Sequence, residues 1–227
     1  MKKILNYFTL FEWCLYILGL LFILLFFILF KNKDYISLIG ALIGVTALIF
    51  VSKGNVVGQI ITVIFSIFYG IISYSYRYYG EMITYLCMTT PIAIMAVVSW
   101  IKNPSKENKH EVKVNTLNIK EYILLFILSI IVTVVFYFIL KYFNTNNLIV
   151  STLSITTSFI ASYLTMRRSR FYAIAYSLND VILIILWVLA SIDNIEYVSM
   201  VTCFVCFLAN DIYGFINWSK LLKRQSN

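Results

Sequence analysis

Two dipeptides, Asn179-Asp180 and Asn210-Asp211, have the chemistry least expected in their surroundings, because each lies inside a long apolar segment. A carboxylate placed in hydrocarbon costs from about 3 to more than about 10 kcal/mol, so a chain that keeps two of them is expected to use them. Amide and carboxylate groups together can bind a small polar molecule. We therefore expect the two pairs to line one pocket for such a solute.

The composition places these residues in a membrane protein. Of the 227 residues, 61% are hydrophobic and 12% are charged, whereas a soluble domain is about half apolar and about a quarter charged. With only two prolines and eight glycines, long helices are favoured over a β-barrel. The net charge of +8 lies in short connections, as topology signals do, so nucleic-acid binding is not expected.

Runs of about 20 apolar residues predict about eight spanning helices, so the expected fold class is an all-α integral membrane protein. The runs cover residues 12–30, 36–51, 55–76, 81–101, 119–141, 148–165, 171–192 and 197–217. Lysine and arginine number fourteen on one side against four on the other, with Lys2 and Lys3 on the richer side and Lys31 and Arg77 on the poorer. By the positive-inside rule, both termini are cytoplasmic.

Two triplets of these helices share a layout: a small-residue helix, a cationic turn, an aromatic helix, and a last helix that closes on Trp100 or Trp218. The triplets are four helices apart and so run in the same direction, which predicts parallel repeats around a pseudo-two-fold axis. The single membrane domain, 1–227, then divides into an N-terminal helix (1–31), repeat one (35–101), a cytoplasmic loop and linker helix (102–145), repeat two (146–219) and a cytoplasmic tail (220–227).

Several other features are expected to be structural. The polar connection 102–118 is predicted to be a solvated linker. Trp100 and Trp218 are predicted to lie in the interfacial aromatic belt, and Glu81 to be a solvated cap. The four cysteines lie in apolar stretches and the single histidine, His110, lies in a charged loop, so neither a metal nor a cofactor is expected.

Counting along the helices places the two Asn-Asp pairs at one depth. Asn179 follows Arg170, at the cytoplasmic start of its helix, by nine residues, and Asn210 precedes Trp218 by eight. At about 1.5 Å per residue both lie roughly 12–14 Å in, near the middle of an apolar core about 30 Å thick. The alternative is that the asparagines only join their helices by hydrogen bonds.

An aromatic stripe shares a helix with Asn179, since Tyr172, Tyr176 and Trp187 recur at helical spacings. Aromatic faces suit the stacking of a flat polar ring, and an amide suits its edge. For Trp187 the alternative is packing against lipid.

The first repeat offers fewer polar residues at depth, with Gln59 as a candidate and Ile92 aligned to Asn210. Pro91 predicts a kink there. The sequence has neither a catalytic motif nor a GxxxxGK[ST] loop, so we expect a carrier working by facilitated diffusion rather than an enzyme.

Three patches carry a resemblance to a known family: Tyr78-Tyr79-Gly80-Glu81-Met82, Asn179, and Asn210-Asp211-Ile212-Tyr213-Gly214-Phe215-Ile216-Asn217-Trp218. With the order of one, three, one and three helices, they resemble the Pnu family of bacterial vitamin-precursor transporters. Ala175 stands where the family's motif has a second aromatic residue, and Asp180 and Asp211 replace small or apolar residues.

The resemblance implies a fold related to SWEET transporters and energy-independent uptake of nicotinamide riboside across the bacterial inner (cytoplasmic) membrane, with trapping by phosphorylation. Thiamine, riboflavin or another nucleoside-like solute is the alternative, and a membrane enzyme or structural protein is a further one. A homo-oligomer stays open. Nine residues are expected to bind the substrate: Asn179 and Asn210 at its edge, Asp180 and Asp211 at ribose hydroxyls or a cationic ring, and Tyr172, Tyr176, Trp187, Tyr213 and Gln59 around it.

Overall fold

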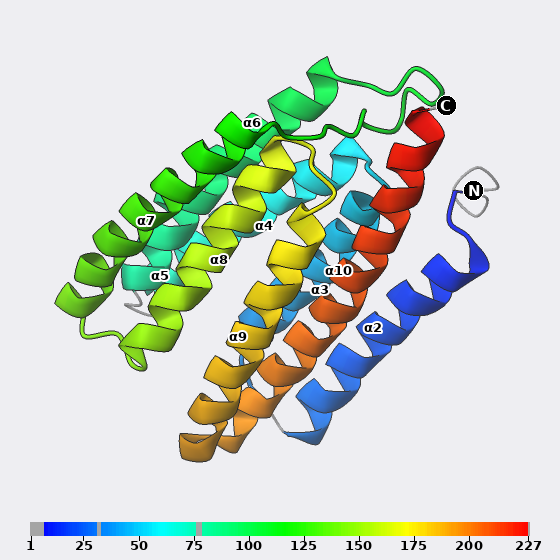
Figure 1. The fold of residues 1–227 in the computed structure, drawn as a ribbon. Helices are drawn as coiled ribbons and strands as arrows, with labels where there is room; N and C mark the ends of the chain where they lie inside the picture. The colour runs from blue at the N-terminus through cyan, green and yellow to red at the C-terminus, as the bar shows by residue number, and fades with distance from the viewer. Residues whose placement is uncertain (1–6, 31–32, 76–78, 227) are drawn as a thin grey trace.

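The computed structural model describes residues 7–30, 33–75 and 79–226 (Figure 1). Lys2, Lys3, Lys31, Arg77 and Tyr78, which entered the topology count and the family resemblance, lie outside the described residues. The elements in order are α2 (Leu10–Leu29), α3 (Tyr35–Ser52), α4 (Val56–Ser75), α5 (Tyr79–Ile83), the π-helical turn η1 (Thr84–Thr89), α6 (Thr90–Lys102), α7 (Ile119–Tyr142), α8 (Leu148–Met166), α9 (Tyr172–Asp193), the 3-10 turn η2 (Ile195–Tyr197) and α10 (Val198–Gln225).

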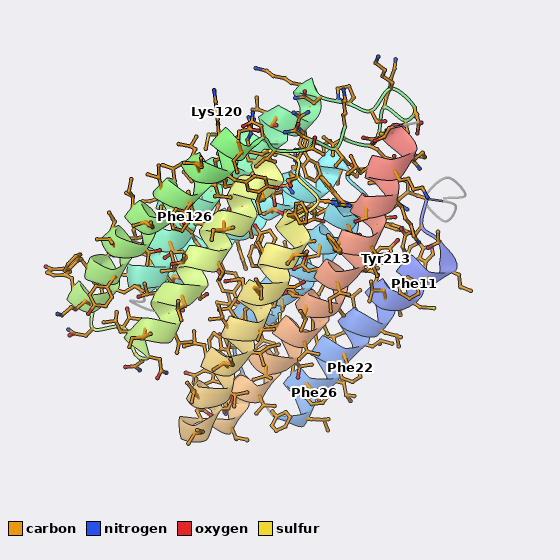
Figure 2. All side chains as sticks on the ribbon, in the orientation of Figure 1. Phe11, Phe22, Phe26, Lys120, Phe126 and Tyr213 are labelled. Carbon is orange, nitrogen blue, oxygen red and sulfur yellow. The ribbon has the colours of Figure 1, made fainter. Side chains whose placement is uncertain are left out.

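The predicted all-α membrane fold is confirmed. Within the described part of the chain, seven helices are long and apolar enough to span a membrane, α5 to α6 counting as one, and α4 is a shorter apolar helix beside them. Large apolar side chains cover the outside of the bundle, such as Phe22 on α2, 49% exposed, and Phe126 on α7, 66% exposed (Figure 2). This outer surface suits lipid.

Six helices form a closed ring. α3 packs against α4 and α10, α6 against α4 and α8, and α9 against α8 and α10. α2 packs on α3 and α10 and α7 packs on α8, so these two lie at opposite edges of the bundle (Figure 1). The last helix of each triplet thus contacts the first helix of the other, as parallel repeats would require. The repeat relation and its SWEET-like description stay predictions.

Two tryptophans close the ring where the triplets meet. The indole Nε1 of Trp100 donates to the carbonyl of Thr165 in α8, and that of Trp218 donates to the carbonyl of Val51 in α3, both at 2.9 Å. The rings lie 5.3 Å apart, and the two side chains are 2% and 0% exposed. The predicted interfacial position is wrong, because each N–H finds its acceptor inside the bundle.

Each triplet has a tight turn after its first helix. Gly54 has a φ of 67° and Arg168 has a φ of 61°, so both residues adopt the left-handed backbone conformation. Glycine adopts this conformation freely, whereas an arginine is strained by roughly 1–2 kcal/mol. Burial and the neighbouring Arg167 charge also lower the pKa of the Arg168 guanidinium. The strained turn is therefore held by contacts from elsewhere in the chain.

Those contacts come from the connection between α6 and α7, residues 103–118, which we call the strap. The backbone N–H of Val112 donates to the Gly54 carbonyl and that of Asn115 to the Arg168 carbonyl, each at 2.9 Å. One continuous segment therefore binds the turns of both triplets, in the same way at each.

The end of α10 holds the strap as well. Gln225 accepts from the Val114 N–H at 2.8 Å and donates to the Val112 carbonyl at 3.1 Å, and Arg224 forms ion pairs with Glu107 and Glu111. Val112 and Val114 are buried. Half of the strap's residues are exposed, as a solvated connection would be, but the strap is not a free linker. It has its own apolar and hydrogen-bonding partners, and α10 continues past the predicted residue 217 to meet it.

We expect Trp218→Phe to destabilise the protein by about 1–3 kcal/mol. The Val51 carbonyl would lose the indole donor and keep its backbone donor Gly54, and the smaller ring would fill less of the buried site. Thermal unfolding of the purified protein in detergent measures this as a lower Tm. Trp187→Phe is the control, since that indole is half-buried near the opposite end of α9. An equal fall of Tm in both variants would contradict a specific stabilising role for the hydrogen bond between Trp218 and Val51.

Candidate functional site

α9 and α10 bring the two Asn-Asp pairs to one place, since the two helices are antiparallel and pack along their length (Figure 1). The four side chains have exposed fractions between 1% and 6%: Asn179, Asp180, Asn210 and Asp211. We call these four residues the Asn-Asp cluster. It lies within the helix ring and is closed to solvent.

The Asn-Asp cluster has more acceptors than donors. The side chains of Asp180 and Asp211 contact each other within hydrogen-bonding distance. Asn210 donates from Nδ2 to the carbonyl of Cys206 at 2.9 Å. Among the described residues, Asp180 Oδ2 and Asn210 Oδ1 are buried oxygens without a donor. A ligand that supplies hydroxyl or amide protons, or positive charge, would satisfy them.

Asn179 is held by α8. Its Oδ1 accepts from Thr157 Oγ1 at 2.9 Å and from Ser154 Oγ at 3.3 Å. This is the helix-joining role considered as the alternative to binding, and Asn179 performs it with the amide oxygen. The amide nitrogen is the part that can donate to a ligand.

Tyr172 and Tyr176 of α9 flank the aspartates. Both lie within electrostatic range of Asp211, and the Tyr176 hydroxyl shares a hydrogen bond of 3.0 Å with Ser162 Oγ. Tyr172 is 1% exposed and fits because position 214 is glycine. A Cβ on Gly214 would lie 2.9 Å from the Tyr172 hydroxyl oxygen, closer than side chains approach.

An aromatic cluster of the first triplet borders the same space. The ring centroids of Phe65 and Tyr69 lie 5.0 Å apart, and those of Tyr69 and Tyr85 lie 5.2 Å apart. Tyr85 is within electrostatic range of Tyr176 and Cys203, and Cys203 is in turn within range of Asp180. Sequence reasoning missed these rings because it searched the first triplet for polar groups, whereas the contribution of that triplet is aromatic.

Tyr85 is positioned by η1, the π-helical turn before Pro91. Pro91 lacks an N–H and its ring clashes with the carbonyl four residues earlier, so an α-helix cannot run through it unchanged. The N–H and the Oγ1 of Thr90 both donate to the Tyr85 carbonyl, the latter at 2.8 Å, and Thr89 Oγ1 donates to the Thr84 carbonyl at 3.2 Å. The proline signalled a kink, and the structure shows a π turn, which recurs at functional sites.

Three of the predicted binding residues have other surroundings. The Trp187 ring packs against Tyr197 at 5.5 Å, where α9 ends. Gln59 is buried in the first turn of α4, nearer one end of the bundle than the aspartates. The Tyr213 hydroxyl donates to Glu12 Oε1 at 2.6 Å, and Figure 2 shows Tyr213 on the side of α10 that faces α2.

Glu12 is a buried carboxylate that sequence reasoning left out. It is 1% exposed, and Lys53 Nζ donates to both of its oxygens at 2.8 Å. It also forms a capping box with Thr9 at the start of α2. The Thr9-x-x-Glu12 pattern was readable as a helix start. The long-range partner Lys53 was not, because it comes from the turn after α3.

The arrangement is suited to binding rather than catalysis, since it offers acceptor oxygens, one amide nitrogen and several phenol rings. Within the described ranges no three His, Cys, Asp or Glu side chains lie close enough together to hold a metal ion. A groove of about 300 Å³ lies elsewhere, between α6 and α8, and is lined by Ile94, Met95, Val98, Ser99, Met166 and Arg167.

A family model described as nicotinamide mononucleotide transporter matches residues 34–220. The chain belongs to this family. It is therefore a multi-pass membrane transporter of a small molecule and not an enzyme. The match covers both triplets and all of the Asn-Asp cluster.

Individual relatives agree with the family model. The chain is 26% identical over 218 residues to the nicotinamide riboside transporter PnuC of Neisseria mucosa, covering 94% of this chain and 82% of that protein. It is 23% identical over 192 residues to PnuC of Haemophilus influenzae, covering 84% and 82%. The crystal structure of the vitamin B3 transporter PnuC superposes with a TM-score of 0.80 at 26% identity, covering 96% of this chain and 94% of the other.

Tyr213→Phe and Tyr176→Phe are expected to have different effects. The first removes a hydrogen bond to the Glu12 carboxylate, worth about 1.5–3 kcal/mol, and should lower Tm while leaving the KM of transport unchanged. The second removes the hydroxyl beside Asp211 and should change KM. Solute uptake into liposomes and thermal unfolding measure the two effects, and equal changes of KM in both variants would contradict this division.

Proposed function

We propose that this protein carries nicotinamide riboside into the cell by facilitated diffusion and binds it near the middle of the membrane, between the two triplets. The observation that carries the proposal is the position of the Asn-Asp cluster beside the aromatic cluster of Phe65, Tyr69 and Tyr85. This site offers ring faces for a flat nicotinamide and polar groups for its edge. The named activity of both PnuC relatives supports the same substrate.

Each group has a role in this proposal. The Asn179 amide nitrogen donates to the carboxamide oxygen of the substrate, and Asn210 Oδ1 accepts from its N–H₂ group. Tyr172 and Tyr176 flank the ring. The aspartates take the ribose hydroxyls or the ring charge.

The remaining candidates act at the margins of the site. Trp187 lines the approach from the far end of α9, where it packs on Tyr197. Gln59 and Tyr213 support the surrounding helices rather than the ligand.

The closed site has to open alternately to each side. The strap and the Trp100–Trp218 contact hold one end of the ring shut, so release at that end requires both to shift. We place that end in the cytoplasm of a bacterial cell, with both chain termini, because lysine and arginine concentrate there. α7 packs only at the edge of the ring and exposes an apolar face that is available to lipid or to a second copy.

Uptake into proteoliposomes tests the proposal. We expect radiolabelled nicotinamide riboside to enter in preference to thiamine or riboflavin, which are the alternative substrates. The double variant Asn179→Ala, Asn210→Ala should raise KM by roughly 10- to 100-fold, because two hydrogen bonds of about 1 kcal/mol each are lost.

Asn146→Ala, an exposed asparagine between α7 and α8, is the control. Unchanged uptake by the folded double variant would contradict the proposed site. Preferential uptake of another vitamin would contradict the assignment of nicotinamide riboside as the substrate.

A further inference from the structure

Among the described residues, the aspartate pair has no counter-charge within the ring. Every lysine and arginine in the described part of the chain lies in a connection, within two residues of a helix end, or in the last two turns of α10. Lys53, at the end of α3, is occupied by Glu12, and Arg167 is paired with Glu121. Along α10, Lys220 is nine residues from Asp211, or about 13 Å. The carboxyl groups of Asp180 and Asp211 therefore meet without a cation from the described residues to balance them.

The neighbouring groups leave the same gap. Asp180 Oδ2 and Asn210 Oδ1 are buried and, in the described part, have no donor. Tyr176 engages Ser162 at its hydroxyl, and Asn210 directs its amide nitrogen to its own helix. The surroundings supply oxygens and ring faces. Buried oxygens in a membrane protein normally have hydrogen-bond donors, so these two are expected to receive theirs, or a positive charge, from a ligand.

Aromatic rings provide the second requirement for binding a positive ring. Tyr85 and Tyr69 border the space from the first triplet and Tyr176 from the second. The negative face of a phenol ring attracts a cation that has lost its water, including cations without an N–H donor. Carboxylates together with aromatic faces recognise charge rather than hydrogen-bonding pattern.

We infer that Asp180 and Asp211 are the specificity-determining counter-charge for a ring with a fixed positive charge, so that the carrier selects N-substituted pyridinium or thiazolium solutes over neutral nucleosides. This inference rests on the proposed function and deepens it. A neutral nucleoside would satisfy some oxygens and still leave a buried carboxylate unbalanced. A cationic ring that lies between the carboxyl groups and the phenol faces would balance the negative charge and also contact the aromatic rings.

The test compares two substrates of nearly the same shape and different charge. Nicotinamide riboside is a pyridinium cation, and its dihydro form is neutral. In proteoliposomes we expect the wild-type protein to take up the cation with a KM at least about tenfold lower than that of the neutral form. This comparison needs no variant, so it holds even where a substitution impairs folding, and equal KM values would overturn the inference.

Charge removal gives the second arm. Asp180→Asn and Asp211→Asn keep the side-chain size, and each is expected to raise the KM of the cation about tenfold or more while the KM of the dihydro form changes less than about twofold. Asp34→Asn is the matched control, because Asp34 caps α3 outside the site and asparagine caps equally well. Parallel changes for both substrates, or no change for either, would overturn the inference.

Two further outcomes separate the causes. If replacing Na⁺ by N-methylglucamine abolishes the effect of the aspartates, a small inorganic cation fills the pair and the inference is wrong. If the wild-type protein takes up neither form of the riboside, the proposed function fails, and thiamine then tests charge selection alone. It should raise the Tm of the wild-type protein and not that of the two aspartate variants, and a missing shift would overturn the inference.

Discussion

A polar group inside this helix bundle has to find its partner within the chain, because hydrocarbon offers none. The indoles of Trp100 and Trp218 reach carbonyls of the opposite triplet, which ties the ring together across its seams. Asn179 bonds the hydroxyls of α8, and Glu12 takes up Lys53. Each of these bonds joins two different segments of the chain. The buried polar groups therefore obtain their partners only when the helices assemble.

The Asn-Asp cluster departs from that rule, and we propose that this departure marks the substrate site of the transporter. Asp180 and Asn210 each retain a buried acceptor oxygen that the described part of the chain does not satisfy. Around them the fold is tight at one end, where the strap binds the turns at Gly54 and Arg168. A substrate that completes the cluster can thus stabilise one arrangement of the ring relative to another, which is the condition for a carrier to change shape on binding.

Much of this could be predicted from the sequence. Apolar run length gives the helices, and the depth of Asn179 and Asn210 follows from counting residues at a fixed rise. The aromatic contribution of Tyr69 and Tyr85 could not be predicted, since an isolated tyrosine in an apolar helix has the same appearance whether it faces lipid or a site. Trp218 was predicted to lie at the membrane interface and is buried instead. Tryptophan is frequent at membrane interfaces, and periodicity does not show which acceptor its N–H will meet.

The sequence by itself determined the class of protein, the helix order and the two Asn-Asp pairs, because hydrophobic length and charge placement act along the chain and need no knowledge of neighbours. Only the tertiary structure decided which partners meet: Asn179 with the hydroxyls of α8, Glu12 with Lys53, and the strap with both turns. Those meetings depend on how helices pack sideways. Side-by-side packing is set by many weak contacts between residues distant in sequence, and a single sequence does not display them.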